Sequence, residues 1–263
     1  MNLYIQFIMY SDWLKDILRC PETLKPLKQD GENFKSEEKV YEVKNRILSI
    51  VYPENPGGND ARYNKIYNLF APLYDLNEKL MGRVLAGVDM IKWRRLIVSM
   101  LGLKTGMSIL EVAPGSGVFQ KFLRNDIGEK GQFVALDLSM GMLKQCQKKN
   151  SHLNVQLIHG NAQYLPFADN SFDALYHFGG INLFNDPQKA IIEFIRVVRK
   201  DGIVSWGDEG FSNNYKDQRR KRFMLRINPG FSKPRPIIPD SVYDVKENEV
   251  YDGMAYLVVA KKR

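Results

Sequence analysis

The stretch that decides the fold is Ser108-Ile109-Leu110-Glu111-Val112-Ala113-Pro114-Gly115-Ser116-Gly117. Its first half is a mostly apolar run, typical of a buried strand. Two glycines one residue apart follow, and they let the backbone turn sharply and approach a ligand closely. The stretch is not the dinucleotide fingerprint GxGxxG, because position 120 is Gln, and it is not a P-loop, because no Gly-Lys-Ser/Thr follows. We therefore expect a ligand-binding turn that does not cradle a pyrophosphate.

Downstream of this loop, short apolar runs alternate with amphipathic stretches. We predict strands at 108–112, 132–136, 155–158, 172–178 and 203–206, separated by helices at 118–125, 140–149 and 187–200. The tail from 242 to 261 holds two further extended runs, and we expect the last strand at 254–260. Strands that alternate with helices at this spacing predict an α/β fold with a doubly wound, mostly parallel sheet.

Polar residues mark the ends of the next two strands. Asp137 ends the second strand about twenty positions after the glycine loop, where an acidic side chain can accept hydrogen bonds from both hydroxyls of a ribose. Asn161 follows the third strand, and its side chain can pair with an adenine edge. Since the carboxyl ends of parallel strands meet at one edge of the sheet, we expect a nucleoside held across three strand ends.

Several ordered motifs now carry a resemblance to a known family. They are Leu110 to Gly117, Ala135-Leu136-Asp137-Leu138-Ser139, Gly160-Asn161-Ala162 with Leu165-Pro166-Phe167, and Arg199-Lys200-Asp201-Gly202. Together they resemble the class I S-adenosylmethionine-dependent methyltransferases, and within these the branch that includes the ubiquinone/menaquinone C-methyltransferases. The resemblance covers about residues 63–206. It implies a Rossmann-like methyltransferase fold with a seven-stranded sheet, and S-adenosyl-L-methionine as cofactor.

The resemblance also implies which residues bind the cofactor. Those expected to contact it are Tyr67, Glu111, Ala113, Gly115, Gly117, Asp137, Leu138, Met142, Asn161, Ala162 and His177. In this assignment the glycine loop holds the methionine part, Asp137 the ribose, and Asn161 the adenine edge. Two positions depart from the family pattern: Ala113 replaces the commonest first glycine of the loop, and Asn161 replaces a frequent Asp. Both remain compatible with cofactor binding, because Ala is small and Asn can still pair with an adenine amine.

The catalytic candidates are polar residues near the predicted strand ends. We name His177, Asp208, Glu209 and Tyr74, with Asn182 as a further residue in a substrate loop. A sulfonium is already an activated methyl donor, so the need for a general base depends on the acceptor. The alternative is a structural role, with His177 as a hydrogen-bonded core histidine and Asp208-Glu209 as a solvated turn.

The positive charge is concentrated in one segment. Residues 214–235 contain eight basic residues against Asp217 alone, and so carry +7 of the net charge of +8. Such a cluster is either an anion-facing patch or a solvated helix face. We favour the second, since few aromatic residues for base stacking lie among the basic ones.

The chain divides into a small module at 1–52, a turn-rich linker at 53–60 and a main domain at 61–263 with a basic insert at about 213–238. Residues 14–21 resemble the start of zinc-ribbon-like modules attached to some methyltransferases. Cys20 is alone, however, and no histidine precedes His152, whereas a structural zinc needs four ligands. We expect a degenerate module that holds no metal.

Composition places the chain among ordinary globular proteins, with 44% apolar and 26% charged residues among its 263. Two cysteines cannot form a disulfide framework. The longest apolar run, at 1–10, is too short to span a bilayer and lacks the basic start and cleavage site of a signal peptide. We expect a cytoplasmic protein.

Three functional hypotheses follow. The one we favour is a methyltransferase for a small-molecule acceptor, lipid-like or quinone-like, because of the family likeness and the apolar loop 178–184. The second is an RNA-modifying methyltransferase that grips nucleic acid with residues 214–235. The third is a cofactor-binding protein without transferase activity. The sequence assigns neither the acceptor atom nor the oligomeric state.

Overall fold

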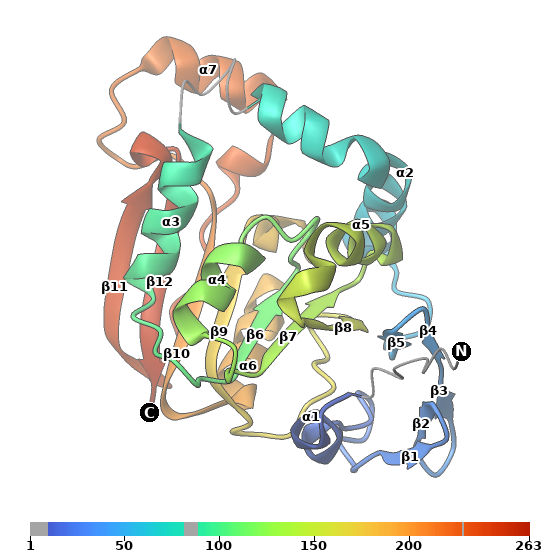
Figure 1. Ribbon diagram of the computed structural model, residues 1–263. Helices are drawn as coiled ribbons and strands as arrows, with labels where there is room; N and C mark the ends of the chain where they lie inside the picture. The colour runs from blue at the N-terminus through green and yellow to red at the C-terminus, as the bar shows by residue number, and fades with distance from the viewer. Residues whose placement is uncertain (1–9, 82–88, 228) are drawn as a thin grey trace.

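The computed structural model describes residues 10–81, 89–227 and 229–263, without the side chains of 74–81, 227 and 229. A large twisted sheet runs through the centre, with helices on both faces (Figure 1). In this described part the sheet has nine strands in the order β11-β12-β10-β9-β6-β7-β8-β5-β4. The seven strands from β11 to β8 are the predicted sheet.

Most of the predicted strands form close to their expected bounds. The strand predicted at 203–206 is longer and begins at Val198, inside the helix predicted at 187–200, because Val198 pairs with Phe172 of the neighbouring strand. They are β6 (Ile109–Val112), β7 (Phe133–Asp137), β8 (Gln156–His159), β9 (Phe172–Phe178), β10 (Val198–Glu209), β11 (Val242–Val250) and β12 (Ala255–Lys262). Strands β8, β7, β6, β9 and β10 are parallel, and β12 pairs antiparallel with β10 and β11. The expectation of a doubly wound, mostly parallel sheet is confirmed. The order reverses between β6 and β9, so a ligand crevice is expected at their carboxyl ends.

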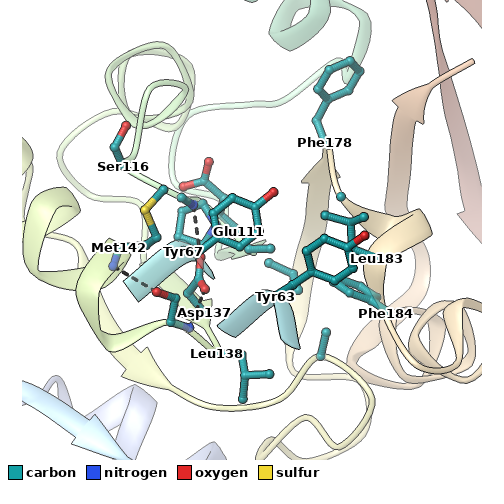
Figure 2. A pocket seen from close by; sticks show the side chains of 18 of the residues that line it. Tyr63, Tyr67, Glu111, Ser116, Asp137, Leu138, Met142, Phe178, Leu183 and Phe184 are labelled. Carbon is teal, nitrogen blue, oxygen red and sulfur yellow. Dashed lines mark hydrogen bonds between the residues drawn. The ribbon is translucent and has the colours of Figure 1, made fainter. Parts of the chain in front are cut away.

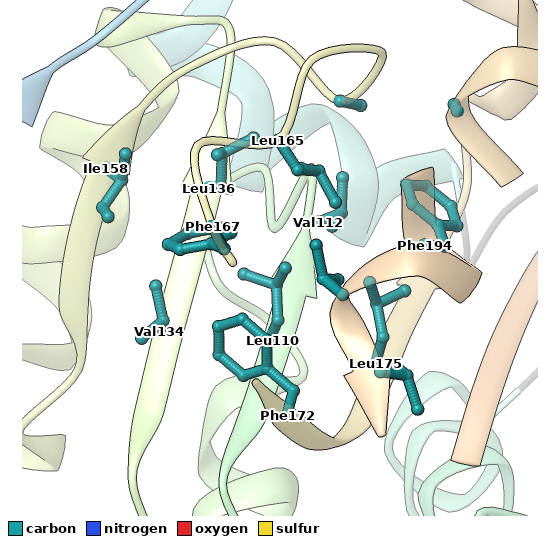
Figure 3. Packing of buried hydrophobic residues seen from close by; sticks show 14 of the residues in the cluster. Leu110, Val112, Val134, Leu136, Ile158, Leu165, Phe167, Phe172, Leu175 and Phe194 are labelled. Carbon is teal, nitrogen blue, oxygen red and sulfur yellow. The ribbon is translucent and has the colours of Figure 1, made fainter. Parts of the chain in front are cut away.

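Successive side chains of each strand point to opposite faces of the sheet, and helices pack on both faces. The helices α3 (Met90–Met100), α4 (Gln120–Ile127) and α5 (Met140–Asn150) cover one face, against residues such as Ile109 and Ala135. The other face carries Leu110 and Val112, which pack against α6 (Pro187–Val197) and the connection from β8 to β9 (Figure 3). Phe167 and Phe172 meet edge to face at 5.1 Å in this second layer.

The N-terminal residues form α1 (Asp12–Ile17), capped by the Ser11 side chain, and a three-stranded sheet of β1 (Lys28–Asp30), β2 (Asn33–Lys35) and β3 (Val40–Tyr41). The hairpin of β4 (Val43–Lys44) and β5 (Ile47–Ser49) adds two strands to the large sheet, because β5 pairs with β8. Helix α1 lies against the connection from β8 to β9, where Arg19 N donates to Pro166 O at 2.9 Å.

Two helices border the carboxyl-terminal edge of the sheet at the top of Figure 1. Helix α2 (Gly58–Met81) begins within the predicted linker and runs over this edge. Helix α7 (Gln218–Ile227) forms in the basic insert, which the sequence left unplaced. The helical spacing of apolar residues at about 84–101 also predicts a helix. Its start, at 84–88, lies outside the described residues, and α3 begins at Met90.

Candidate active site

A cavity of about 620 Å³ opens at the carboxyl ends of β6, β7 and β9, where the strand order reverses. Its volume is in the range of small-molecule sites. Figure 2 shows Asp137, Leu138 and Met142 on one side and Phe178, Leu183 and Phe184 on the other, with two tyrosines of α2 between them. The cavity therefore has a polar end at the glycine loop and an apolar end opposite.

The glycine loop turns through three left-handed residues. Ala113, Gly115 and Gly117 have φ angles of 52°, 57° and 76°. Ala113 thus adopts a left-handed conformation that favours glycine and is strained for alanine. Gly115 lines the cavity, whereas a Cβ on Gly117 would lie 2.3 Å from Asn150 Nδ2 and 2.7 Å from Cys146 Sγ. Gly117 is thus required for close packing of the loop on α5 rather than for lining the cavity.

Asp137 lies at the end of β7, as predicted, and lines the cavity. Its two carboxylate oxygens accept hydrogen bonds from Gly115 N at 3.1 Å and from Ser139 N at 2.8 Å. Burial raises the pKa of Asp137 to about 6, against these backbone donors, which lower it. The side chain is therefore held in one orientation by the loops after β6 and β7, with oxygen lone pairs left for a ligand.

Glu111 forms the floor of the polar end. It is only 2% exposed, and its Oε2 has no hydrogen-bond partner among the described residues. Burial raises the pKa of Glu111 to about 8; a nearby Gln120 side chain opposes this rise, and the Asp137 charge adds to it. Two buried carboxylates close together favour a cationic ligand, because a cation offsets both the desolvation and their mutual repulsion.

The apolar end is built from parts of the chain that are distant in sequence. Phe178 ends β9, Leu183 and Phe184 lie in the following loop, and Tyr251 and Met254 precede β12. Met224 of α7 and Phe231 close it from the basic insert. Aromatic contacts join these parts, with Phe178 and Tyr251 centroids 5.7 Å apart. The surface suits an apolar, planar ligand.

Helix α2 lies across the cavity. Tyr63, Asn64 and Tyr67 line it, and the structure thus brings Tyr67 to the expected place. Asn68, on the same helix, accepts hydrogen bonds through Oδ1 from Ser139 Oγ at 3.0 Å and Gly141 N at 2.6 Å. These bonds dock α2 on the start of α5.

A buried carboxylate that the sequence analysis missed fixes the start of α2. Asp60 accepts hydrogen bonds from Asn185 N at 2.9 Å, from Gln163 Nε2 at 2.6 Å and from Asn161 Nδ2 at 3.3 Å. Its partners lie 101 to 125 positions away, so no local motif marks it. The amide of Asn161, predicted to read adenine, is engaged in this network, and its Oδ1 accepts from Gln163 N at 3.0 Å.

The other predicted site residues fall into two groups. Those that line the cavity, besides Asp137 and Tyr67, are Glu111, Ala113, Gly115, Leu138, Met142, Asn161, Ala162 and Glu209. Those that do not are Gly117, His177, Asn182 and Asp208. The side chain of Tyr74 lies outside the described residues.

His177 and Asp208 are fully buried, and neither lines the cavity; both instead bond to backbone groups of segments that form its wall. His177 Nδ1 donates to Val112 O at 2.9 Å, and burial lowers its pKa, so the ring is neutral. Asp208 accepts hydrogen bonds from three backbone groups, Gly180 N and Glu209 N at Oδ1 and Asn182 N at Oδ2. Asn182 is buried, and its backbone is fixed by Asp208 and by Lys233, which donates to Asn182 O.

Residues 57–211 of the chain match the ubiE/COQ5 methyltransferase family. The chain belongs to this family. The resemblance inferred from the glycine loop, Asp137 and the strand-end motifs is confirmed at the level of the family.

Two relatives have the name demethylmenaquinone methyltransferase. The one from Renibacterium salmoninarum is 36% identical over 147 residues, which are 54% of this chain and 58% of the relative. The one from Listeria monocytogenes is 31% identical over 157 residues, 59% of this chain and 65% of the relative. The similarity thus spans less than two thirds of each relative.

A solved structure of a SAM-dependent methyltransferase from Aquifex aeolicus has the same fold. It superposes with a TM-score of 0.53 at 20% identity, over 73% of this chain and 98% of that one. The chain therefore has the Rossmann-like fold of S-adenosylmethionine-dependent methyltransferases.

Proposed function

We propose that this protein transfers a methyl group from S-adenosylmethionine to a small, apolar, quinone-like acceptor. The observation that carries this proposal is the two-ended cavity, with buried carboxylates beside the glycine loop and aromatic side chains opposite. Family membership and the names of the relatives support a methyl acceptor of the quinone class.

The polar end fits the cofactor. S-adenosylmethionine supplies a methyl group that its sulfonium has already activated. Asp137, held by Gly115 N and Ser139 N, accepts hydrogen bonds from ribose hydroxyls. Glu111 balances the positive charge of the ligand, which fits an unpartnered, buried carboxylate oxygen. Leu138, Met142 and Ala162 provide apolar contacts for the adenine.

The apolar end orients the acceptor. Phe178, Phe184 and Phe231 enclose a planar ring, and Leu183 and Met254 fill the space around it. Alignment of a nucleophilic atom behind an activated methyl group supplies most of the rate in such a transfer. Asp208 acts as a positioning residue, because it fixes the loop that carries Leu183 and Phe184.

Among the predicted catalytic residues whose side chains are described, Glu209 lines the cavity, and we propose it as the group that accepts a proton from an acceptor hydroxyl. His177 and Asp208 are proposed to support the wall rather than to touch substrate, since both are fully buried behind it.

The test is transfer of a labelled methyl group to a reduced demethylated naphthoquinone with a short prenyl chain. Turnover that falls on Glu209→Gln and on Phe184→Ala supports the proposal. Methylation of RNA instead, lost on charge removal in 214–235, would favour the nucleic-acid hypothesis. Cofactor binding without turnover on either acceptor class would favour a non-transferase role.

We also propose that the N-terminal module is a metal-free relative of a zinc ribbon. Cys20 is buried, and its Sγ lies 3.3 Å from the Tyr41 hydroxyl. Within the described residues, no cluster of three or more His, Cys, Asp or Glu side chains could hold a metal ion. Metal analysis of the purified protein tests this, and one bound zinc per chain would contradict it.

A further inference from the structure

Helix α2 presents an apolar stripe to solvent. Ile66, Leu69, Phe70 and Leu73 are 38%, 74%, 53% and 60% exposed. Their spacing of i, i+3, i+4 and i+7 places them on one face of the helix. Asn64 lies on the opposite face and lines the cavity, while Tyr63 and Tyr67, which also line it, lie beside the stripe. An amphipathic helix normally turns such a stripe toward a core, so an exposed one marks an interaction surface.

Helix α7 borders the same cavity and supplies charge. Over 218–227 it has five basic residues and no acidic one. Phe223 in its middle is 47% exposed, while Met224 lines the cavity. Helix α2 adds Arg62 and Lys65, both exposed, beside its apolar stripe. Basic side chains beside exposed apolar ones are the composition of helices that lie in the interface of an anionic bilayer.

We propose that the outer faces of α2 and α7 dock this protein on a membrane surface that contains anionic lipid. The proposed contact is interfacial, because the apolar and basic side chains lie together on the outer faces of these helices. None of the described helices is long and apolar enough to cross a bilayer. Leu69, Phe70 and Phe223 enter the headgroup region, and Arg219 and Arg222 contact lipid phosphates.

Lipid fits this surface better than two other occupants. RNA would pair with the basic residues but leaves the aliphatic side chains of Ile66, Leu69 and Leu73 in water. A second copy docked by the same face would bring the α7 helices of both molecules, each with five basic residues, to one interface. An anionic bilayer satisfies the charge and the apolar stripe together.

The docking surface and the cavity share the helices α2 and α7, because both helices contribute residues that line the cavity. An apolar acceptor dissolved in the bilayer would thus enter between α2 and α7 without crossing water. This route rests on the proposed function, whereas the lipid binding itself does not.

Co-sedimentation with vesicles tests the proposal, using phosphatidylcholine alone and phosphatidylcholine with about one-third phosphatidylglycerol. The full-length wild type should bind the anionic vesicles, weakly at high salt, and not the neutral ones. Arg219→Gln/Arg222→Gln should weaken binding about 25-fold, since each basic residue near the surface contributes about fivefold. Leu69→Ser/Phe70→Ser should weaken it about tenfold or more.

Matched controls are Lys121→Gln/Lys144→Gln, which removes the same charge from exposed sites on α4 and α5, and Ile192→Ser, at a 56% exposed site on α6. Both should bind vesicles as the wild type does. Equal losses in controls and docking variants, or no binding to anionic vesicles, would overturn the proposal. So would a dimer in sedimentation velocity that Leu69→Ser/Phe70→Ser dissociates, or tight binding to single-stranded RNA without binding to vesicles.

Calorimetry with S-adenosylhomocysteine on the same proteins separates the two proposals. All five should bind the ligand equally, because none of the changed residues lines the cavity. Vesicle binding without ligand binding would refute the proposed function alone, and the reverse would refute the docking surface alone.

Discussion

Glu111 and Tyr176 are paired in register across β6 and β9, and each has a buried oxygen without a hydrogen-bond partner among the described residues. Burial raises the pKa of both side chains. Unsatisfied polar atoms cost stability, so this pair is unfavourable in the ligand-free protein. A cationic ligand in the adjoining cavity would offset that cost, which links the local instability of the site to its function.

Glu111→Gln should therefore stabilise the ligand-free protein at neutral and higher pH. With a folded pKa of about 8 against 4.5 for the ordinary group, the native state binds more protons than the unfolded state within this window. Wild-type stability relative to the variant should fall as pH rises from ~5 to ~8, by up to ~1.4 kcal/mol per pH unit. Urea unfolding of both proteins across this range measures it.

The same substitution should weaken cofactor binding. A cationic ligand prefers ionised Glu111, so wild-type affinity relative to Glu111→Gln should rise with pH through about 8. Titration calorimetry at several pH values gives the ratio. A ratio that does not change with pH would refute the role of Glu111, because protonation of the ligand itself affects both proteins alike.

The two glycines of the loop should respond differently to alanine. Gly117→Ala forces a Cβ into Asn150 and Cys146 at a φ of 76°, and we expect a loss of about 3 kcal/mol in unfolding free energy. Gly115→Ala meets only the flexible end of Met142 at 3.3 Å, so about 1 kcal/mol is expected, with weaker cofactor binding. Thermal unfolding ranks the variants, and equal losses would contradict the packing argument.

Asp60→Ala should destabilise the protein by about 3 kcal/mol, because the Asn161 amide and the Asn185 N–H lose their acceptor and Gln163 loses its shorter bond. Since Asp60 anchors α2, the KM for cofactor should also rise. Asp30→Ala, at an exposed site on β1, is the control and should change stability by less than about 0.5 kcal/mol. Similar effects of the two substitutions would show that the network does not hold α2.

Asp137 and Asp60 differ in whether a local sequence pattern marks their role. The site role of Asp137 could be predicted because local features mark it. It ends an apolar strand, and it follows the glycine loop at the spacing typical of a ribose-binding carboxylate. Asp60 has no such marker, since its role arises from partners on two distant loops. His177 sits at a strand end like a site residue, yet the pleat directs its ring to Val112, Phe184 and Phe194.

The position of the basic insert at about 213–238 likewise could not be predicted from a local pattern. Its basic composition predicted a charged excursion, whereas its position is set by contacts with distant parts of the chain, such as the packing of Phe231 and Tyr215 near Met254 and the bonds of Gln188 with the Ile237 backbone. Strands and helices, by contrast, follow from hydrophobic period, and β9 formed at the predicted bounds, Phe172–Phe178.

Asp208→Asn separates a positioning role from catalysis. The amide cannot accept from all three backbone donors, so the loop at 180–184 should loosen. We expect a several-fold higher KM for the acceptor, with an unchanged pH profile of kcat and unchanged cofactor affinity. A large fall in kcat with loss of its pH dependence would instead make Asp208 the general base.

The central claim is that the loops after β6 and β7 form a cofactor site around Asp137. Calorimetric titration with S-adenosylhomocysteine tests it on the wild type, Asp137→Ala and the surface control Asp169→Ala, with thermal unfolding to verify that each protein is folded. We predict that the wild type and the control bind equally, and that Asp137→Ala binds about a hundredfold more weakly, since two hydrogen bonds to a charged group are lost. Equal affinity in all three proteins, or no binding to folded wild type at millimolar ligand, would contradict the account.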